Sequence, residues 1–360
     1  FAGEASLEDI AKYSDSENID FANAFVNEDL NNTSLLAGGE GLVEAADSHD
    51  GGFSDTTTAS FSADATIGAI DGDTTSEATV VEYQFNIGLS TSFTGEDSLD
   101  IAIDSGSTAA STADNPMAFD TGAGLSVDGV TYSFPVGGVS MLVGVDTNIG
   151  AVFTGACSYN AFTDWMSNCG TDLSVGVGGM GVTAAGSYAF DSGFSLAAGV
   201  SGTADGTNTA ANKVGLFTKE GEDLYAIEAA YTADSWGLAV AYVYDDNAAS
   251  AETTYWGVNG TYSFDLVDLS VGVETEETSG VDKTGYFFGA TFPEVGPGSV
   301  SAGVATTTNF TDTATNYFIY ELAYEYPVND GLTITPGVFI EEKAGADDLT
   351  GIIVKSSFSF

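Results

Sequence analysis

The stretch Ile352-Ile353-Val354-Lys355-Ser356-Ser357-Phe358-Ser359-Phe360 ends the chain, and its alternate side chains from Ile352 to Phe360 are nearly all apolar. This period of two is that of a β-strand with one covered face. In a soluble protein such a strand would be an exposed edge that invites aggregation. A closed barrel has no edge, and its terminal aromatic residues can lie in a membrane-interface girdle. We therefore expect a transmembrane β-barrel, with Phe358 and Phe360 as its assembly signal.

The same alternation recurs from Ser60 onward, as in the apolar face Val81, Tyr83, Phe85 and Ile87. Eighteen segments qualify as strands: 60–70, 79–93, 98–105, 125–134, 139–146, 172–178, 181–190, 194–202, 212–218, 223–233, 236–245, 254–264, 266–275, 284–292, 298–306, 315–326, 332–342 and 350–360. Bacterial barrels have even strand numbers. We expect an all-β, antiparallel barrel of 16 strands, with 18 as the alternative.

The region before this repeat has a different character, because residues 31–58 are rich in Gly, Asp, Ser and Thr. Residues 17–26 space their apolar side chains as a short amphipathic helix does. The sequence therefore predicts an N-terminal extension over 1–58, periplasmic or folded into the pore mouth, and a transmembrane barrel over 59–360. Because the sequence begins at Phe1 with neither an initiator Met nor a signal-peptide pattern, we expect a processed, exported protein.

The composition is strongly acidic, with 53 Asp and Glu residues against six lysines and a net charge of −47. Such a chain cannot neutralise phosphates, which excludes nucleic acid as a partner. Self-repulsion of this size is weaker in high salt, where the Debye length falls to roughly 3 Å. We therefore expect a marine or otherwise saline exterior.

The connections fall into two lengths, as expected of a membrane barrel. Tight turns at 191–193, 233–235 and 329–331 are predicted on the periplasmic side. Longer loops at 106–124, 147–171, 203–211 and 246–253 are predicted outside. Tyr and Trp residues on the apolar face lie toward strand ends, where an interface girdle would be (Tyr83, Trp236, Tyr244, Tyr326).

The face opposite the apolar one carries small residues and scattered acids, and in a membrane barrel this face lines water. Its acidic candidates are Asp64, Glu82, Asp100, Asp104, Glu228, Glu321, Glu325 and Glu341. Rings of carboxylates favour cations in a pore, so we expect a weakly cation-selective channel. The alternative is that these groups only hold water against the wall.

Cys157 and Cys169 are the only cysteines, and an oxidising compartment favours a disulfide that closes their loop. Such a bridge stabilises the loop by about 3 kcal/mol in the chain-entropy model. Phe162, Asp164 and Trp165 make the same loop a candidate for an inward-folded constriction or a clasp between subunits. An exposed, disulfide-braced loop is the alternative.

Other motifs carry little chemistry. Asp71, Asp73 and Glu77 could bind calcium weakly, but their spacing is not that of an EF-hand and a solvated turn is the simpler interpretation. No other cofactor is indicated. A single histidine, His49, cannot build a multi-histidine metal site, and nothing in the sequence supports an enzyme.

Four segments resemble the Som-type outer-membrane porins of marine picocyanobacteria: 35–43, 92–99, the cysteine loop 155–170, and 190–199. The resemblance implies a homotrimeric outer-membrane channel for passive uptake of small hydrophilic nutrients. Its other partners would be outer-membrane lipid, lipopolysaccharide and the outer-membrane assembly machinery. Residues 1–58 do not resemble the wall-binding module of many members, and the absence of Arg argues against a strong transverse field at the constriction. The competing hypotheses are an acidic surface structural or adhesion protein and, on weaker grounds, a barrel enzyme.

Overall fold

The computed structural model describes residues 56–72, 78–107, 124–163, 166, 169, 181–203, 222–247, 252–306, 317–343 and 345–360. Residues 1–55 lie outside this set, so the short helix at 17–26 and the division at residue 58 stay predictions. In the described part, no helix is both long enough and apolar enough to cross a membrane. Its one helical element is a 3₁₀ turn, η1, at Ile149–Val152.

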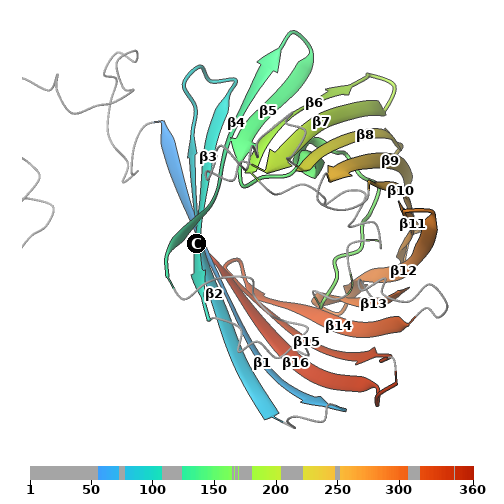
Figure 1. Cartoon of the computed structure of the whole chain (residues 1–360). Helices are drawn as coiled ribbons and strands as arrows, with labels where there is room; N and C mark the ends of the chain where they lie inside the picture. Colours follow the sequence, from blue (N-terminus) through green and yellow to red (C-terminus); the bar gives the residue numbers. More distant parts are fainter. Residues whose placement is uncertain are drawn as a thin grey trace, which may run out of the picture. The chain divides into compact units, whose positions relative to one another are not determined.

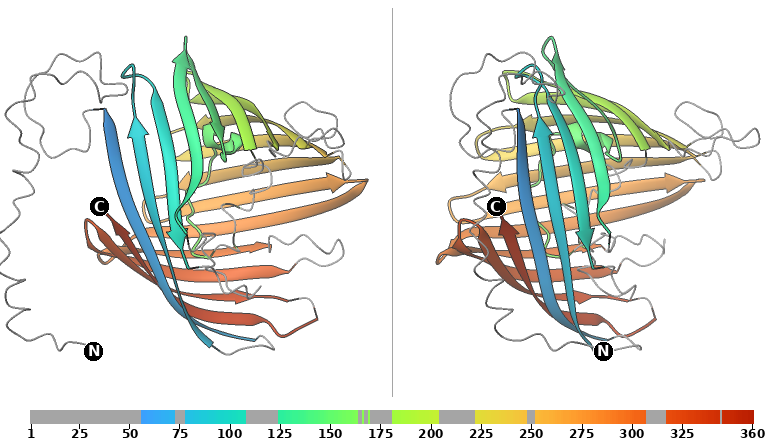
Figure 2. Two further views of the ribbon diagram at one scale, coloured as in Figure 1. Left: turned by 60° about the vertical axis from the view of Figure 1, so that its left-hand side comes forward. Right: turned by 90° about the vertical axis from the view of Figure 1, so that its left-hand side faces the viewer.

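Sixteen antiparallel strands form a closed ring in sequence order (Figures 1 and 2). They are β1 Thr57–Asp71, β2 Ala78–Thr91, β3 Ser98–Gly106, β4 Ser126–Val136, β5 Val139–Val145, β6 Gly181–Ala189, β7 Phe194–Thr203, β8 Glu222–Thr232, β9 Trp236–Asn247, β10 Thr253–Ser263, β11 Asp268–Thr278, β12 Val281–Val295, β13 Gly298–Thr306, β14 Phe318–Asn329, β15 Leu332–Glu341 and β16 Leu349–Ser359. The prediction of a 16-stranded antiparallel barrel is confirmed.

The two extra candidate strands at 172–178 and 212–218 lie outside the described residues. The wall has no place for either, because β5 pairs directly with β6 and β7 pairs directly with β8. The ring closes where β1 pairs with β16, with Gly68 opposite Ile353 and Ser62 opposite Ser359. The terminal strand is therefore paired on both sides, as its covered apolar face requires.

Connections alternate between the two ends of the barrel because the strands alternate in direction. Those after even-numbered strands have two to six residues, whereas those after β3, β5 and β7 span 107–125, 146–180 and 204–221. The turn 92–97 is built around Asp97, whose carboxylate accepts hydrogen bonds from Tyr132 Oη at 2.6 Å and from the Phe93 and Thr94 amides at 2.9 and 2.8 Å. These bonds, the one from Tyr132 first, hold the pKa of Asp97 well below its usual range.

The outer face of the wall is exposed and apolar. Side chains such as Val81, Ile227, Leu322 and Ile352 are 65%, 51%, 49% and 58% exposed. Contiguous apolar surface of this kind marks contact with a membrane or a partner protein. It is the inverse of a soluble barrel, whose apolar side chains would fill its interior.

Aromatic side chains gather in two bands at the strand ends. At the end with short turns, Tyr188 contacts Phe190, Tyr231 contacts Trp236, and Tyr262 contacts Phe264, with ring centroids 4.5 to 5.0 Å apart. At the other end, Tyr242 contacts Trp256 at 4.7 Å and Tyr225 lies 6.3 Å from Tyr244. Two such bands are typical of the interface girdles of a membrane-spanning barrel.

Candidate functional site

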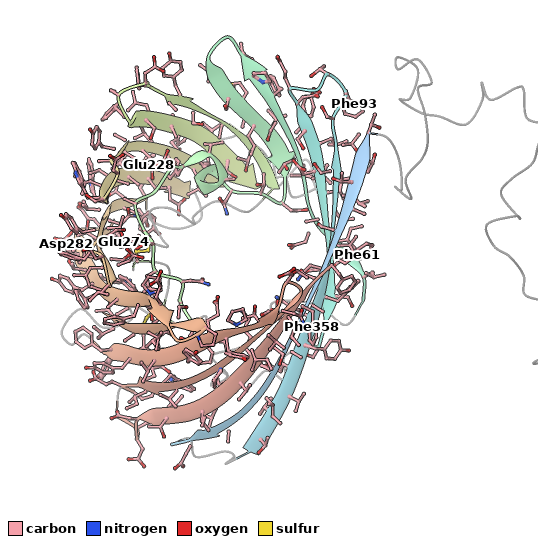
Figure 3. The ribbon with its side chains drawn as sticks, turned by 180° about the vertical axis from the view of Figure 1, so that it is seen from behind. Phe61, Phe93, Glu228, Glu274, Asp282 and Phe358 are labelled. Atoms are coloured by element: carbon pink, nitrogen blue, oxygen red, sulfur yellow. A yellow bond between two sulfur atoms is a disulfide. The ribbon has the colours of Figure 1, made fainter. Side chains whose placement is uncertain are left out.

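The inner face of the wall carries the acidic residues. All eight acids that the alternation assigns to the pore lie on the inner face of the wall, whereas the exposed apolar side chains lie on the outer face. They are Asp64, Glu82, Asp100, Asp104, Glu228, Glu321, Glu325 and Glu341. Figure 3 shows Glu228 on the inner side of the wall and Phe358 on the outer side. The register therefore gathers these carboxylates around one lumen.

Several of these carboxylates are held by neutral donors or by lysine. Asp64 accepts hydrogen bonds from Gln84 Nε2 at 2.8 Å and from Ser357 Oγ at 2.5 Å. Ser126 Oγ donates to Asp104 at 2.7 Å, and Ser98 Oγ to Asp100 at 2.9 Å. These donors fix the positions of the three carboxylates on the inner wall.

The predicted set missed lumen-facing acids, of which Glu274 is one. Glu274 on β11 is 1% exposed, and its position alternates with the outward Val271 and Val273. The alternation of this strand was the signal that could have identified it. Asp73 and Glu77, the rest of the possible calcium loop with Asp71, lie outside the described residues. Among those described, no group of three or more His, Cys, Asp or Glu side chains is arranged to hold a metal.

The connection after β5 runs along the inside of the wall (Figure 1). It begins with η1, whose Ile149 is buried against β6, β8 and β9. The Glu228 carboxylate then accepts hydrogen bonds from the backbone N–H of Thr154 at 2.6 Å and of Gly155 at 3.2 Å. Glu228 is 1% exposed, so a buried charge on the wall is satisfied by the backbone of the loop.

Polar side chains of β10 and β11 provide the next contacts along the loop. The Ala156 amide donates to Asn259 Oδ1 at 2.8 Å, and the Ser158 amide to Ser270 Oγ at 3.1 Å. The Ser158 hydroxyl lies 2.7 Å from Thr261 Oγ1. The loop thus follows the inner wall strand by strand, with its backbone donors paired to wall acceptors.

Glu321 on β14 forms the most extensive contact. Its Oε1 accepts hydrogen bonds from Tyr159 Oη and the Phe162 amide, both at 2.7 Å. Its Oε2 accepts from the Thr163 amide at 3.0 Å and the Thr163 hydroxyl at 2.9 Å. Burial and the neighbouring Glu321 charge raise the pKa of Tyr159 far above its usual value, so its hydroxyl remains a donor.

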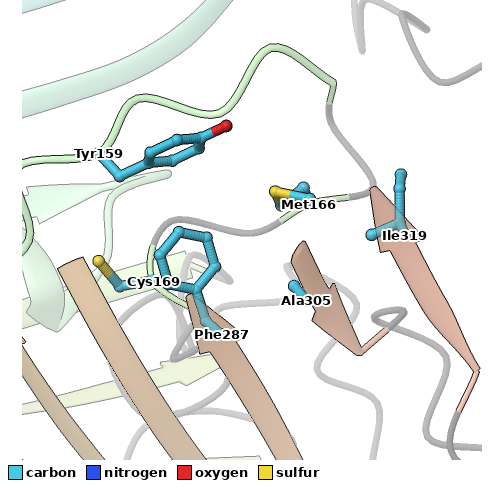
Figure 4. Close-up of a cluster of buried hydrophobic side chains, with 6 residues drawn as sticks. All are labelled: Tyr159, Met166, Cys169, Phe287, Ala305 and Ile319. Atoms are coloured by element: carbon cyan, nitrogen blue, oxygen red, sulfur yellow. The ribbon is translucent and has the colours of Figure 1, made fainter. Parts of the chain in front are cut away.

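Apolar packing adds to the hydrogen bonds between Glu321 and the loop. Tyr159, Met166 and Cys169 of the loop bury their side chains against Phe287, Ala305 and Ile319 of β12–β14 (Figure 4). The Cys157–Cys169 disulfide, with a Cα–Cα distance of 5.9 Å, closes the loop between them and confirms the predicted bridge.

Of the predicted constriction residues, Phe162 packs its ring on the wall near Phe339 and is 7% exposed. Its burial makes it part of the loop's attachment to the wall. Asp164 and Trp165 lie outside the described residues.

The wall accommodates the loop because glycines face it. A Cβ on Gly272 would lie 1.5 Å from the Cys169 carbonyl oxygen, and one on Gly337 would lie 2.3 Å from the Phe162 ring. Gly289 and Gly303 are similarly close to Tyr159. Side chains at these positions would hold the loop off the wall. These four glycines are therefore the surface on which the loop packs, called its seat below.

Replacing Gly272 with alanine is expected to push the Cys169 segment into the lumen and to lower single-channel conductance. Overpacking of this kind costs about 1–3 kcal/mol, while Glu228 and Glu321 still hold the rest of the loop. The matched control is Gly260→Ala on β10, where the added Cβ would have no neighbour nearer than 3.3 Å. Equal conductance of the two variants in planar bilayers would contradict the seat.

Comparisons with known proteins agree with this architecture. A family model described as Gram-negative porin matches residues 137–338. No curated protein sequence matches the chain. The high-pH structure of Pseudomonas putida OprB is similar with a TM-score of 0.66 at 13% identity, covering 85% of this chain and 94% of that one. A mutant of the Rh. blastica porin gives 0.55 at 16% identity, covering 84% and 100%. At these identities the likeness shows a common fold.

Proposed function

Since the chain belongs to the Gram-negative porin family, we propose that it is a passive diffusion channel for small hydrophilic solutes and ions in an outer membrane. The observation that carries this proposal is the arrangement of the two faces. Exposed apolar side chains and aromatic bands suit lipid on the outside, while hydroxyls and carboxylates line the inside. A ring of 16 strands is wide enough to enclose an aqueous channel.

The loop after β5 is the proposed constriction. Residues 149–163 lie against the inner wall through bonds to Glu228 and Glu321, and the disulfide closes the loop on itself. A loop that occupies part of a wide lumen sets the smallest cross-section for a solute. We therefore propose that solutes cross the lumen by passive diffusion and that no reaction is catalysed there.

Weak cation selectivity is the expected consequence of the lumen carboxylates, because they attract cations and repel anions. In planar bilayers with a KCl gradient, the reversal potential is expected to favour cations and to lose part of this bias at high salt, as charges are screened. Neutralising three lumen acids together is expected to reduce the bias further: Asp64→Asn, Asp100→Asn and Asp104→Asn.

The control carries the same change of charge on exposed turns: Asp234→Asn, Asp265→Asn and Asp330→Asn. These residues belong to connections at the end with short turns, so the bias should remain nearly that of the wild type. An unchanged reversal potential in the lumen variant would contradict the role of the carboxylates. Absence of conductance from folded, inserted protein would contradict the channel itself.

The finer assignments follow from the sequence. We propose a homotrimer, supported by the extended apolar outer face, and conductance steps in threes would test it. The acidic composition and the resemblance to Som-type porins favour nutrient uptake in a marine cyanobacterial outer membrane, with lipopolysaccharide and the assembly machinery as further partners. The extension 1–58 is proposed to lie in the periplasm or the pore mouth.

A further inference from the structure

A polar pocket of about 340 Å³ lies between the docked loop and the inner wall of β12–β16. The loop contributes Ser158 and Asn160. The wall contributes a set of hydroxyls: Ser299, Ser301, Thr333, Thr335 and Ser357. The pocket therefore offers many hydrogen-bonding groups next to the proposed constriction.

Two opposite charges line this pocket, Glu325 and Lys355. Lys355 on β16 pairs across to Thr335 on β15. Glu325 on β14 also lies beside Thr335, because the β14–β15 register runs from Ala323–Gly337 to Tyr326–Ile334. The two charged residues are thus two strand spacings apart, about 10 Å between their Cα atoms, with the Thr335 hydroxyl between them.

Lys355 differs from the other lysines that the structure describes. Lys283 pairs with Glu276 at 2.8 Å, and Lys343 with Glu341 at 2.9 Å. In the described part of the chain, the side chains of Lys355 and Glu325 form no ion pair and no hydrogen bond. An ammonium and a carboxylate that face one pocket without pairing leave both charges available to a solute.

We propose that this pocket is a transient binding site for small zwitterions, namely free α-amino acids. This inference rests on the proposed channel function. The solute's ammonium would meet Glu325 and its carboxylate would meet Lys355, with hydroxyls completing the contacts. Two charge-assisted hydrogen bonds of about 2.8 Å each, joined through a solute of about 3 Å, span roughly 9 Å between the carboxylate oxygen and the ammonium nitrogen, a gap that side chains two strands apart on one pocket wall can adopt. The balanced charge of the pair favours a zwitterion over a simple anion or cation.

The experiment measures uptake into proteoliposomes of L-serine at low concentration, with glycerol as the neutral reference. Lys355→Gln and Glu325→Gln are each expected to lower the serine-to-glycerol ratio by about threefold, as loss of one charge pair in a wet site does. The exchange variant, Glu325→Lys with Lys355→Glu, is expected to restore the ratio. Lys283→Gln, which removes a lysine outside the pocket, should leave it unchanged.

The outcomes separate this inference from the channel assignment. No glycerol flux through folded wild-type protein would overturn the proposed function. Normal glycerol flux with the same serine-to-glycerol ratio in every variant would overturn the zwitterion site alone. Lactate and ethanolamine serve as singly charged test solutes, one an anion and the other a cation. If Lys355→Gln lowers lactate flux as much as serine flux, the pocket is an anion site and the proposal is wrong.

Discussion

Replacing Glu321 with alanine is expected to detach the docked loop from the wall and to turn a steady open channel into one that closes frequently. Glu321 is 4% exposed and accepts four hydrogen bonds from Tyr159, Phe162 and Thr163. Its removal leaves these loop donors without their acceptor in a buried position. No nearby acceptor on β14 can replace it, because Ala323 follows on the same face.

The magnitude follows from the cost of unpaired buried groups. Each unsatisfied donor costs about 1–3 kcal/mol, and bonds to a charged acceptor are at the upper end. A total loss of about 3–5 kcal/mol would shift the equilibrium between docked and detached loop by roughly 10²–10⁴-fold. The disulfide keeps the detached segment compact, so it would remain in the lumen as a mobile obstruction.

Two measurements distinguish a detached loop from a simple loss of lumen charge. Single-channel recordings should show frequent closures at voltages where the wild type stays open. The Cys157–Cys169 disulfide, with Cys169 fully buried, should become accessible to a membrane-impermeant reductant. Glu325→Ala is the matched control, since it removes the same charge four residues along the same face of the same strand. If Glu321→Ala and Glu325→Ala behave alike in both measurements, Glu321 does not hold the loop.

The alternation of side chains was enough to predict the wall, because a strand between lipid and water must repeat every two residues. Sixteen of the eighteen candidate segments coincide with strands of the ring. The two that do not, 172–178 and 212–218, belong to connections after odd-numbered strands. Their local sequence pattern matches that of the strands, and only the direct pairing of β5 with β6 and of β7 with β8 shows that the ring does not include them.

The seat of the loop could not be predicted in the same way. Glu321 was identified as a lumen acid from its place on β14, but its partners lie 158 to 162 residues away in the chain. Nothing local distinguishes it from Glu325, which makes no contact of this kind. From the sequence, Gly272 and Gly337 are only small residues on the inward face. The need for glycine at these positions comes from the loop, which passes too close to the wall for a Cβ. Contacts set by the closed ring decide which acids hold the loop and which face water.

The aromatic bands were anticipated only in part. Tyr83, Trp236 and Tyr326 were recognised on the outer face. The contacts between neighbouring strands, such as Tyr231 with Trp236, depend on the register of the turns. Because register fixes which rings meet, the girdle is a property of the assembled sheet.

Deletion of Phe360 is expected to reduce strongly the yield of folded barrel, because this residue secures one end of the β1–β16 junction that closes the ring. Its amide donates to the Phe61 carbonyl at 3.0 Å, and its carbonyl accepts from the Phe61 amide at the same distance. The two rings are stacked, 5.8 Å apart and 7° from parallel, and Phe61 also stacks on Phe85 at 6.3 Å. Loss of two ladder bonds and one aromatic contact costs about 2–4 kcal/mol.

That cost falls at the junction between β1 and β16, the pair that completes the ring. A junction that frays from this end would expose backbone groups of β1 and β16 to the hydrocarbon core, which disfavours insertion. The yield is measured as the fraction of outer-membrane protein whose electrophoretic mobility changes on boiling. Phe264→Ala is the control, since Phe264 is an exposed aromatic of the same band, in the turn between β10 and β11, with no part in closure. A normal folded fraction after deletion of Phe360 would show that β1 and β16 close without this residue and that it is no assembly signal.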